Sequence, residues 1–139
     1  MEEKRYLFIF LLFATAIVLS ACSSEPSVTI STGINVHKAN EIIVENKDVI
    51  VLDVRTPKEF VKGHISGAIN INIHDPTFSQ QVAALDREKL YIIHCAVNPR
   101  GGRGDKSIHI MNQLGFSNLL SLDGGLNAWK RANLPIRNT

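Results

Sequence analysis

The sequence predicts an α/β domain in which a parallel β-sheet carries helices on both faces, and three observations lead to this prediction. Short apolar runs rich in β-branched residues alternate along the chain with segments whose apolar residues recur at helical spacing. The length, 139 residues, leaves room for one domain. Hydrophobic residues make up 45% of the chain and charged residues 20%, so there is enough apolar material for a packed core.

Four short apolar segments are expected to form strands. Residues 49–52 are a continuous β-branched run, as in a strand that is covered on both faces. Residues 69–73 alternate isoleucine with asparagine, which predicts a strand with one more polar side. Residues 91–93 and 119–120 are expected to be two further short strands.

Segments with helical periodicity lie between these strands. One apolar stripe falls within residues 36–43, a weaker one within 82–85, and a third within 108–114. Gly115 follows the third stripe in the position where glycine commonly ends a helix. A last helix is expected to include residues 126–129, directly after a Gly-Gly turn.

One helix start can be assigned in detail. Thr56 provides a hydroxyl at the N-cap, Pro57 occupies the first helical position, and Glu59 is the third helical residue. This is the pattern of a capping box with its preferred proline. We therefore expect Glu59 to have a structural role in this cap.

Polar or reactive residues follow three of the expected strands. They are Asp53, Cys95 and Asp123. Ligands of open α/β sheets bind beyond the carboxyl ends of the strands, and the carboxyl ends of parallel strands share one edge. The sequence thus predicts a site at this edge of the sheet.

Cys95 opens a loop, residues 96–104, that is rich in glycine and arginine and leads into a helix expected to begin near Asp105. Glycines allow a tight loop with inward-facing amides, and the helix N-terminus and the arginines add positive charge. Such surroundings stabilise a thiolate and bind an anion, whereas a cysteine used only for packing does not need them. Cys95 is therefore the candidate catalytic nucleophile. The candidate substrate-binding residues are Arg100, Gly101, Gly102 and Arg103.

Two segments flanking Cys95 resemble the signatures of rhodanese-like sulfurtransferase domains. Residues 52–60 (LDVRTPKEF) and 63–70 (GHISGAIN) resemble the N-terminal signature, and residues 123–129 (DGGLNAW) with 134–136 (LPI) resemble the C-terminal one. The resemblance covers residues 29–137 and implies one rhodanese-like domain with a five-stranded parallel sheet. It also implies a persulfide formed on the family's catalytic cysteine from a small anionic sulfane-sulfur donor such as thiosulfate. The persulfide sulfur would then pass to a thiol or cyanide-like acceptor.

The cysteine loop departs from the family pattern, which commonly reads Cys-Arg-x-Gly-x-Arg. Ala96 and Asn98 replace the first arginine and the glycine, whereas Arg100 matches. When the alignment with the family pattern is instead made backward from Leu114, the loop is longer than in the family, and Arg103 occupies the position of the arginine. Arg100 is slightly favoured as the arginine that faces the substrate, and the length change leaves the identity of the substrate open.

Two other function classes remain open. A longer cysteine loop suits a larger oxyanion and hence phosphate or arsenate chemistry, but the phosphatase spacing requires arginine at position 101, which is Gly101. A non-catalytic or redox-sensing module with the same fold is the other alternative, because an exposed thiolate is readily oxidised.

The net charge of +2 and the scattered basic residues give no support to nucleic-acid binding. We expect a monomer.

The remaining polar residues are expected to be structural. Adjacent residues of a strand point to opposite faces, so His94 is not expected to act as a base for Cys95. The histidines show no metal-ligand spacing, and neither a metal nor a cofactor is expected. Supporting roles in loops or core are expected for Asp53, Arg55, His64 and Trp129.

The N-terminal segment has the features of a targeting signal. Two basic residues precede an apolar run, residues 6–21, that is shorter than the roughly 20 residues of a membrane-spanning helix. Residues 19–22 (LSAC) resemble a bacterial lipobox. We expect residues 1–21 to be a lipoprotein signal peptide, Cys22 to carry the lipid, residues 22–28 to be a flexible tether and residues 29–137 to form the domain. The protein would then be attached to the cell membrane outside the cytoplasm. A plain signal peptide or a tail anchor, with an incidental cysteine, is the alternative.

Overall fold

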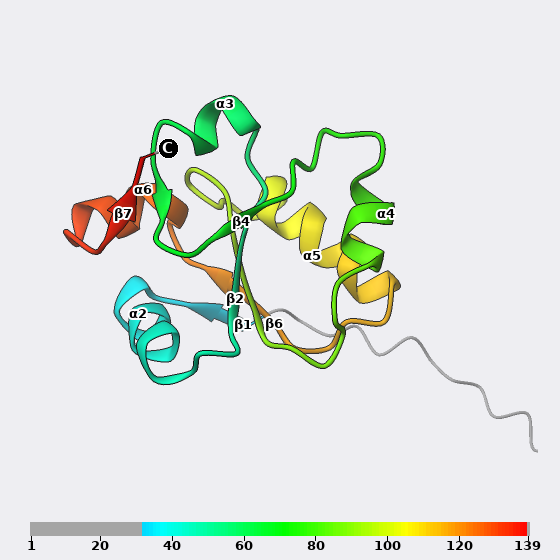
Figure 1. The fold of residues 1–139 in the computed structure, drawn as a ribbon, viewed down its shortest axis with the longest axis horizontal. Coiled ribbons are helices and arrows are strands. Elements are labelled where there is room, and N and C mark those ends of the chain that lie inside the picture. Colours follow the sequence, from blue (N-terminus) through cyan, green and yellow to red (C-terminus); the bar gives the residue numbers. More distant parts are fainter. Residues whose placement is uncertain (1–31, 139) are drawn as a thin grey trace, which may run out of the picture.

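The computed structural model describes residues 32–138, which form an α/β domain built on a five-stranded parallel sheet (Figure 1). The strand order is β1-β6-β5-β2-β4, and every pair of neighbours is parallel. The strands of this sheet are β1 (Thr32–Ile34), β2 (Ile50–Asp53), β4 (Ile69–Asn70), β5 (Tyr91–His94) and β6 (Leu119–Leu122). The predicted fold class is confirmed. The expected signal peptide, Cys22 and the tether lie outside the described residues.

Helices cover both faces of the sheet. In Figure 1 the sheet is seen nearly edge-on, with α2 and α6 on one side and α4 and α5 on the other. The helices are α2 (Val36–Glu45), α3 (Pro57–Phe60), α4 (Phe78–Ala83), α5 (Arg103–Gln113) and α6 (Gly125–Arg131). Because successive strand residues face opposite sides, Ile92 packs with the α2 and α6 layer while Ile93 packs with the α4 and α5 layer.

The predicted helix boundaries are close to the observed ones. The capping box at Thr56 is present: its side chain accepts from the backbone N–H of Glu59, and the Glu59 carboxylate accepts from the backbone N–H of Thr56. Helix α5 ends before Gly115, which adopts a φ of +88° as a C-terminal glycine does. It begins at Arg103 instead of near Asp105, so Arg103 belongs to the helix and not to the loop.

A second, two-stranded antiparallel sheet was not predicted from the sequence. It joins β3 (His64–Ile65) to β7 (Ile136–Arg137). The buried indole of Trp129 contributes to the same corner by donating from Nε1 to the carbonyl oxygen of Pro135 at 3.0 Å. The two motif segments of the sequence, one early and one late, are therefore in direct contact.

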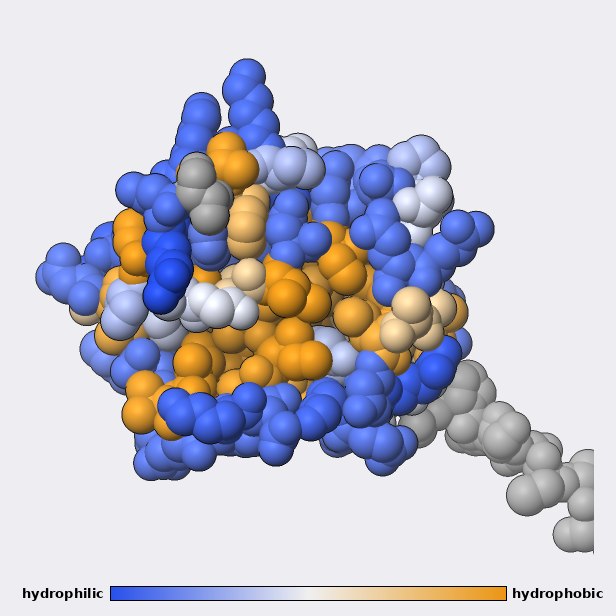
Figure 2. Space-filling model, in the orientation of Figure 1, coloured by the Kyte–Doolittle hydropathy of each residue, from blue (hydrophilic) through white to orange (hydrophobic). Residues whose placement is uncertain are grey.

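The edge strand β4 is short and is fixed by a side chain. The amide Nδ2 of Asn70 donates to the carbonyl oxygens of Asp53 at 2.9 Å and of Arg55 at 2.8 Å. Figure 2 shows apolar residues gathered across the middle of the face that includes β4, with polar residues above and below. None of the helices among residues 32–138 has the length and hydrophobicity needed to cross a bilayer.

Candidate active site

The carboxyl edge of the sheet collects the three strand ends that were predicted from the sequence. Strand β2 ends at Asp53, β5 ends directly before Cys95, and β6 ends directly before Asp123. The three strands are parallel, and the register pairs Asp53 with His94. Cys95 therefore lies at the same edge as the two aspartates, at the start of the loop that leads into α5.

The backbone of Cys95 is fixed by the N-terminus of α6. Its carbonyl oxygen accepts from the N–H of Leu126 at 3.0 Å, and the next carbonyl, of Ala96, accepts from Asn127 at 2.9 Å. This close approach requires glycine at position 125, where a Cβ would lie 2.5 Å from the Cys95 oxygen and where φ is +55°. The Gly-Gly sequence at the start of α6 thus fixes the backbone of Cys95, the candidate nucleophile.

The thiol of Cys95 is buried and receives a backbone hydrogen bond. Cys95 is 2% exposed, and its Sγ accepts from the N–H of Asn98 at 3.1 Å. Asn98 has a φ of +49°, a left-handed conformation that asparagine tolerates and glycine favours. This conformation explains why asparagine can replace the glycine of the family pattern here. The Nδ2 of Asn98 also donates to Ser121 Oγ at 2.7 Å, which ties the loop to β6.

Arg103 brings positive charge to the thiol. Its guanidinium interacts electrostatically with Cys95 and at the same time pairs with Glu59, with Nη1–Oε2 and Nη2–Oε1 distances of 2.8 and 2.9 Å. The pKa of Arg103 is raised, chiefly by the hydrogen bonds to Glu59 and to a smaller extent by Cys95. The arginine in turn lowers the pKa of Glu59 to about 2. Because Arg103 is the first residue of α5 and helical side chains lean toward the N-terminus, its side chain reaches back to the loop.

The other candidate substrate-binding residues lie further out in the loop. Arg100 is exposed. The N–H of Gly101 donates to Asp105 Oδ2 at 2.7 Å, and the N–H of Gly102 donates to the carbonyl oxygen of Pro99 at 2.9 Å. These two amides therefore stabilise the loop from within, and the amide that reaches the sulfur is that of Asn98.

A buried ion pair between Asp53 and Arg55 stabilises the segments around the site, in line with the supporting roles expected for these two residues. Arg55 binds both carboxylate oxygens of Asp53 and also donates to the carbonyl oxygens of Glu59 at 3.2 Å and Gly63 at 2.9 Å. Charge-assisted bonds of this kind are strong when they are buried. The pair connects β2 to α3 and to the turn after it. His64 completes this corner, since its ring stacks on Phe60 with centroids 3.8 Å apart.

His94 is turned away from the thiol. It is fully buried, and its Nδ1 lies 3.2 Å from the carbonyl oxygen of Cys95, not from the sulfur. Since a carbonyl oxygen only accepts, Nδ1 carries the proton. Its Nε2 lies 3.7 Å from Asp53 Oδ2, which is too long for a hydrogen bond. Burial lowers the pKa of His94 more than Asp53 raises it, so the imidazole is neutral.

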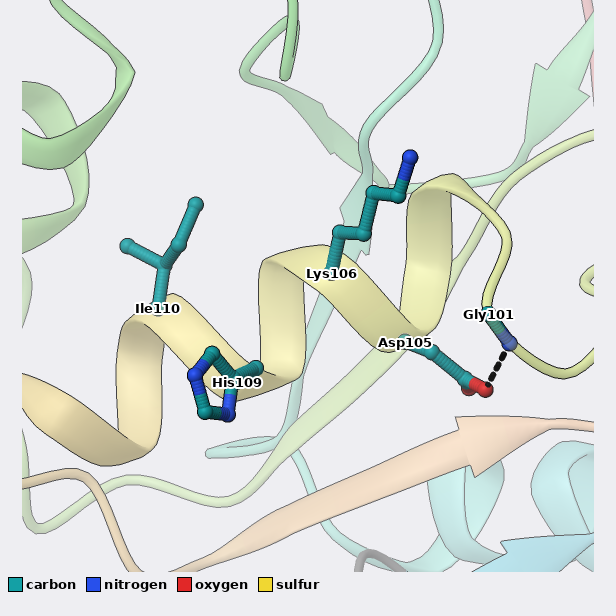
Figure 3. Close-up of a pocket in the computed structure, with 5 residues that line it drawn as sticks. All are labelled: Gly101, Asp105, Lys106, His109 and Ile110. Atoms are coloured by element: carbon teal, nitrogen blue, oxygen red, sulfur yellow. Dashed lines mark hydrogen bonds between the residues drawn. The ribbon is translucent and has the colours of Figure 1, made fainter.

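A surface hollow lies beside the site but does not contain the cysteine. It has a volume of about 470 Å³ and is lined by Gly101, Asp105, Lys106, His109 and Ile110. Figure 3 shows Lys106 and Ile110 projecting from one side of α5 and Asp105 and His109 from another. Only Gly101 belongs to the cysteine loop, so this hollow is not where the thiol would react. Among residues 32–138, no group of three or more His, Cys, Asp or Glu side chains could hold a metal ion.

Two contributors to the site were not identified from the sequence. Asn98 was noted only as a departure from a pattern, and Glu59 was assigned only to the capping box. A positive φ at Asn98 could have been inferred from the glycine that the pattern has there. The contact between Glu59 and Arg103 joins residues 44 positions apart, and no local spacing predicts it.

The chain is similar to known sulfurtransferases and to solved structures with the same fold. The chain is 27% identical over 103 residues to a sulfurtransferase of Allochromatium vinosum, covering 74% of this chain and 92% of that protein. It is 30% identical over 98 residues to thiosulfate sulfurtransferase GlpE of Vibrio cholerae, covering 70% and 88%. The structure resembles a rhodanese-related protein from Thermoplasma volcanium, with a TM-score of 0.67, 30% identity and coverage of 78% and 99%. A family model described as Rhodanese-like domain matches residues 35–132, and the chain therefore belongs to the rhodanese-like domain family.

Proposed function

We propose that this protein is a sulfurtransferase that forms a persulfide on Cys95 from a small anionic sulfane-sulfur donor such as thiosulfate. The observation that carries the proposal is the buried thiol of Cys95, whose Sγ accepts from the N–H of Asn98 at 3.1 Å. The guanidinium of Arg103 adds a positive charge that interacts electrostatically with Cys95. The names of the GlpE relatives, which are thiosulfate sulfurtransferases, support the choice of donor.

The reaction proceeds in two nucleophilic displacements. In the first, the thiolate of Cys95 attacks the outer sulfur of thiosulfate, the sulfur–sulfur bond of the donor breaks with its electron pair going to sulfite, and a cysteine persulfide anion remains. In the second, a thiolate or cyanide attacks the outer persulfide sulfur, and the Cys95 thiolate leaves. Each step conserves charge and needs no external oxidant.

The N–H of Asn98 and the guanidinium of Arg103 can stabilise the anionic sulfur species in both displacements. The thiolate, the bound dianion and the persulfide are all anionic, so fixed N–H groups and a guanidinium stabilise each in turn. Because Cys95 is only 2% exposed, the proposed reaction requires the atoms that cover the sulfur to move before the donor can reach it. His94, which is neutral and faces a carbonyl group, takes no part in proton transfer.

We further propose that the protein works as a lipid-anchored monomer outside the cytoplasm. The support is the sequence of residues 1–22, in which two basic residues, an apolar run and a lipobox-like LSAC follow one another. Lipid on Cys22 would leave Cys95 as the only free thiol in the mature chain, since the sequence holds two cysteines. A single thiol that is regenerated in each cycle is sufficient for the proposed chemistry.

Thiocyanate production from thiosulfate and cyanide tests the proposed function. The purified protein should produce thiocyanate in repeated turnovers, and Cys95→Ser should produce none above the uncatalysed rate. Absence of thiocyanate with cyanide and with small thiols as acceptors would contradict sulfur transfer from this donor. Hydrolysis of an aryl phosphate by the same preparation, lost in Cys95→Ser, would instead favour oxyanion chemistry at the lengthened loop.

A further inference from the structure

We propose that Glu59 is a positioning residue that holds the guanidinium of Arg103 at the thiol, so that anions approaching Cys95 meet a fixed positive charge. This inference rests on the proposed function for its relevance to thiosulfate, but the arrangement itself can be tested without sulfur transfer. It gives Glu59 a role beyond the capping box that the sequence predicts.

Glu59 and Arg103 form a two-point contact. Nη1 of the arginine donates to Oε2 and Nη2 donates to Oε1, at 2.8 and 2.9 Å. Paired parallel hydrogen bonds of this kind fix the plane of the guanidinium as well as its position. The side chains are 26% and 36% exposed for Arg103 and Glu59, so an unpaired arginine at this place could adopt many rotamers in solvent.

The glutamate is itself fixed on two sides. Its Oε2 accepts from the backbone N–H of Thr56 at 3.0 Å and from the Thr56 hydroxyl at 2.7 Å. Its carbonyl oxygen accepts from Arg55, which is paired with the buried Asp53. The core of the sheet, the short helix α3 and the arginine at the thiol are thus connected by consecutive contacts, and α3 acts as the support for Arg103.

Two effects of the glutamate on an incoming anion oppose each other. The negative charge of Glu59 repels the anion, whereas its two hydrogen bonds to Arg103 keep the guanidinium near the sulfur. The guanidinium interacts electrostatically with Cys95, and the carboxylate is hydrogen-bonded to the guanidinium. Coulomb energy falls with distance, so the nearer positive charge outweighs the carboxylate as long as the arginine stays in place. Loss of the glutamate should therefore weaken anion recognition.

The variants Glu59→Gln, Arg103→Ala and the double variant form the test, with Thr56→Ala as the matched control. Glutamine keeps an oxygen for the N–H of Thr56 but cannot accept from both arginine nitrogens. Thr56→Ala removes one of the two Thr56 donors to Oε2 of Glu59 but leaves the backbone N–H of Thr56, the carboxylate and its pairing with Arg103. Arg103→Ala supplies a second probe of the pair should Glu59→Gln fail to fold, because it leaves the hydrogen bonds between Thr56 and Glu59 in place.

The first measurement is the ratio of alkylation rates of Cys95 by iodoacetate and by iodoacetamide. The two reagents need similar access to the sulfur, but only iodoacetate is an anion, so the ratio reports charge at the thiol. Glu59→Gln should lower the ratio roughly threefold to tenfold, toward the value of Arg103→Ala, and Thr56→Ala, which keeps the carboxylate, should lower it by less than about twofold. In the Arg103→Ala background, Glu59→Gln should have no further lowering effect. An unchanged or increased ratio in Glu59→Gln would overturn the inference.

The second measurement separates binding from chemistry in turnover with thiosulfate. Glu59→Gln should raise the KM for thiosulfate by about the same factor as it lowers the alkylation ratio, with a smaller change in kcat. An equal rise of KM in Thr56→Ala would show that general loosening of α3 is the cause and would overturn the inference. If the wild type makes no thiocyanate but the alkylation ratios change as expected, the role of Glu59 stands and the proposed function fails.

Discussion

The side-chain oxygen of Asn98 occupies the place where any side chain at position 104 would begin. A Cβ on Gly104 would overlap Oδ1 of Asn98, and that oxygen is buried without a hydrogen-bond partner among the described residues. The other amide atom, Nδ2, donates to Ser121. The asparagine thus lies between β6 and the first turn of α5 and sets the shape of the lengthened loop, while its N–H contacts the sulfur of Cys95.

Gly104→Ala should therefore destabilise the protein and impair turnover together. The added methyl group must displace the Asn98 side chain, and overpacking of this kind costs on the order of 1–3 kcal/mol. Asn98→Gly in the same chain removes the clashing amide and also suits the φ of +49°. Denaturant unfolding should show that the double variant recovers most of the stability. A double variant as unstable as Gly104→Ala alone would mean that another contact is responsible.

Acid should weaken the fold in part through Glu59. Its pKa in the folded protein is lowered from 4.5 to about 2, chiefly by the hydrogen bond from Arg103. A lowered carboxyl pKa contributes stability that is fully present above pH 4.5 and is lost as the pH falls toward 2. The difference in unfolding free energy between the wild type and Glu59→Gln should shrink across this window. More than a third of the Glu59 side chain is exposed, so solvent screening keeps the change small. A constant difference from pH 6 to about 2 would contradict the pairing.

Arg100 and Arg103 should contribute unequally to binding of thiosulfate. Arg103 interacts electrostatically with Cys95, whereas Arg100 is exposed in the loop. Arg103→Ala should raise the KM for thiosulfate on the order of tenfold, the scale of a lost charge-assisted hydrogen bond, and Arg100→Ala should change it less than about twofold. Steady-state kinetics of the two variants decide between them. A larger effect of Arg100→Ala would mean that Arg100 takes the position of the family's arginine, as it does when the pattern is aligned from Cys95. If neither variant changes the KM, the backbone N–H of Asn98 would be the remaining hydrogen-bond donor to the anion.

Lipid attachment should depend on Cys22. In a bacterial host supplied with labelled fatty acid, the wild type should incorporate label and fractionate with membranes, whereas Cys22→Ala should do neither. Cys95→Ser serves as the control, because it removes a thiol elsewhere in the chain and should be labelled as the wild type is. Equal labelling of Cys22→Ala and the wild type would exclude the proposed anchor.

The fold could be predicted from the sequence because its signals are local. The capping box at Thr56 and the glycine after α5 depend on residues within a few positions of one another, and both are confirmed. The same holds for the alternation of apolar runs and helical segments that predicts a parallel sheet with helices on both faces; the fifth strand, β1 (Thr32–Ile34), was not among the strands expected from these runs. The small β3–β7 sheet could not be predicted, since each strand has two residues and its partner is about half the chain away.

The candidate site was predictable only in part, for the same physical reason. Cys95 stands out because a strand, a glycine-rich loop and a helix follow one another directly. Which arginine reaches the sulfur depends on where α5 begins, and the helix starts two residues before the position expected from the sequence. The support of Arg103 by Glu59 depends on one side-chain contact between α3 and the first residue of α5, which no pattern within either segment encodes.

The most direct test of sulfur transfer through Cys95 is the intact mass of the protein after incubation with thiosulfate and removal of excess donor. The account predicts that the wild type gains the mass of one sulfur atom, that cyanide removes it, and that thiocyanate appears in equal amount. Cys95→Ser should gain nothing under the same conditions. A wild-type protein whose mass does not change, or a gain that persists in Cys95→Ser, would contradict the account.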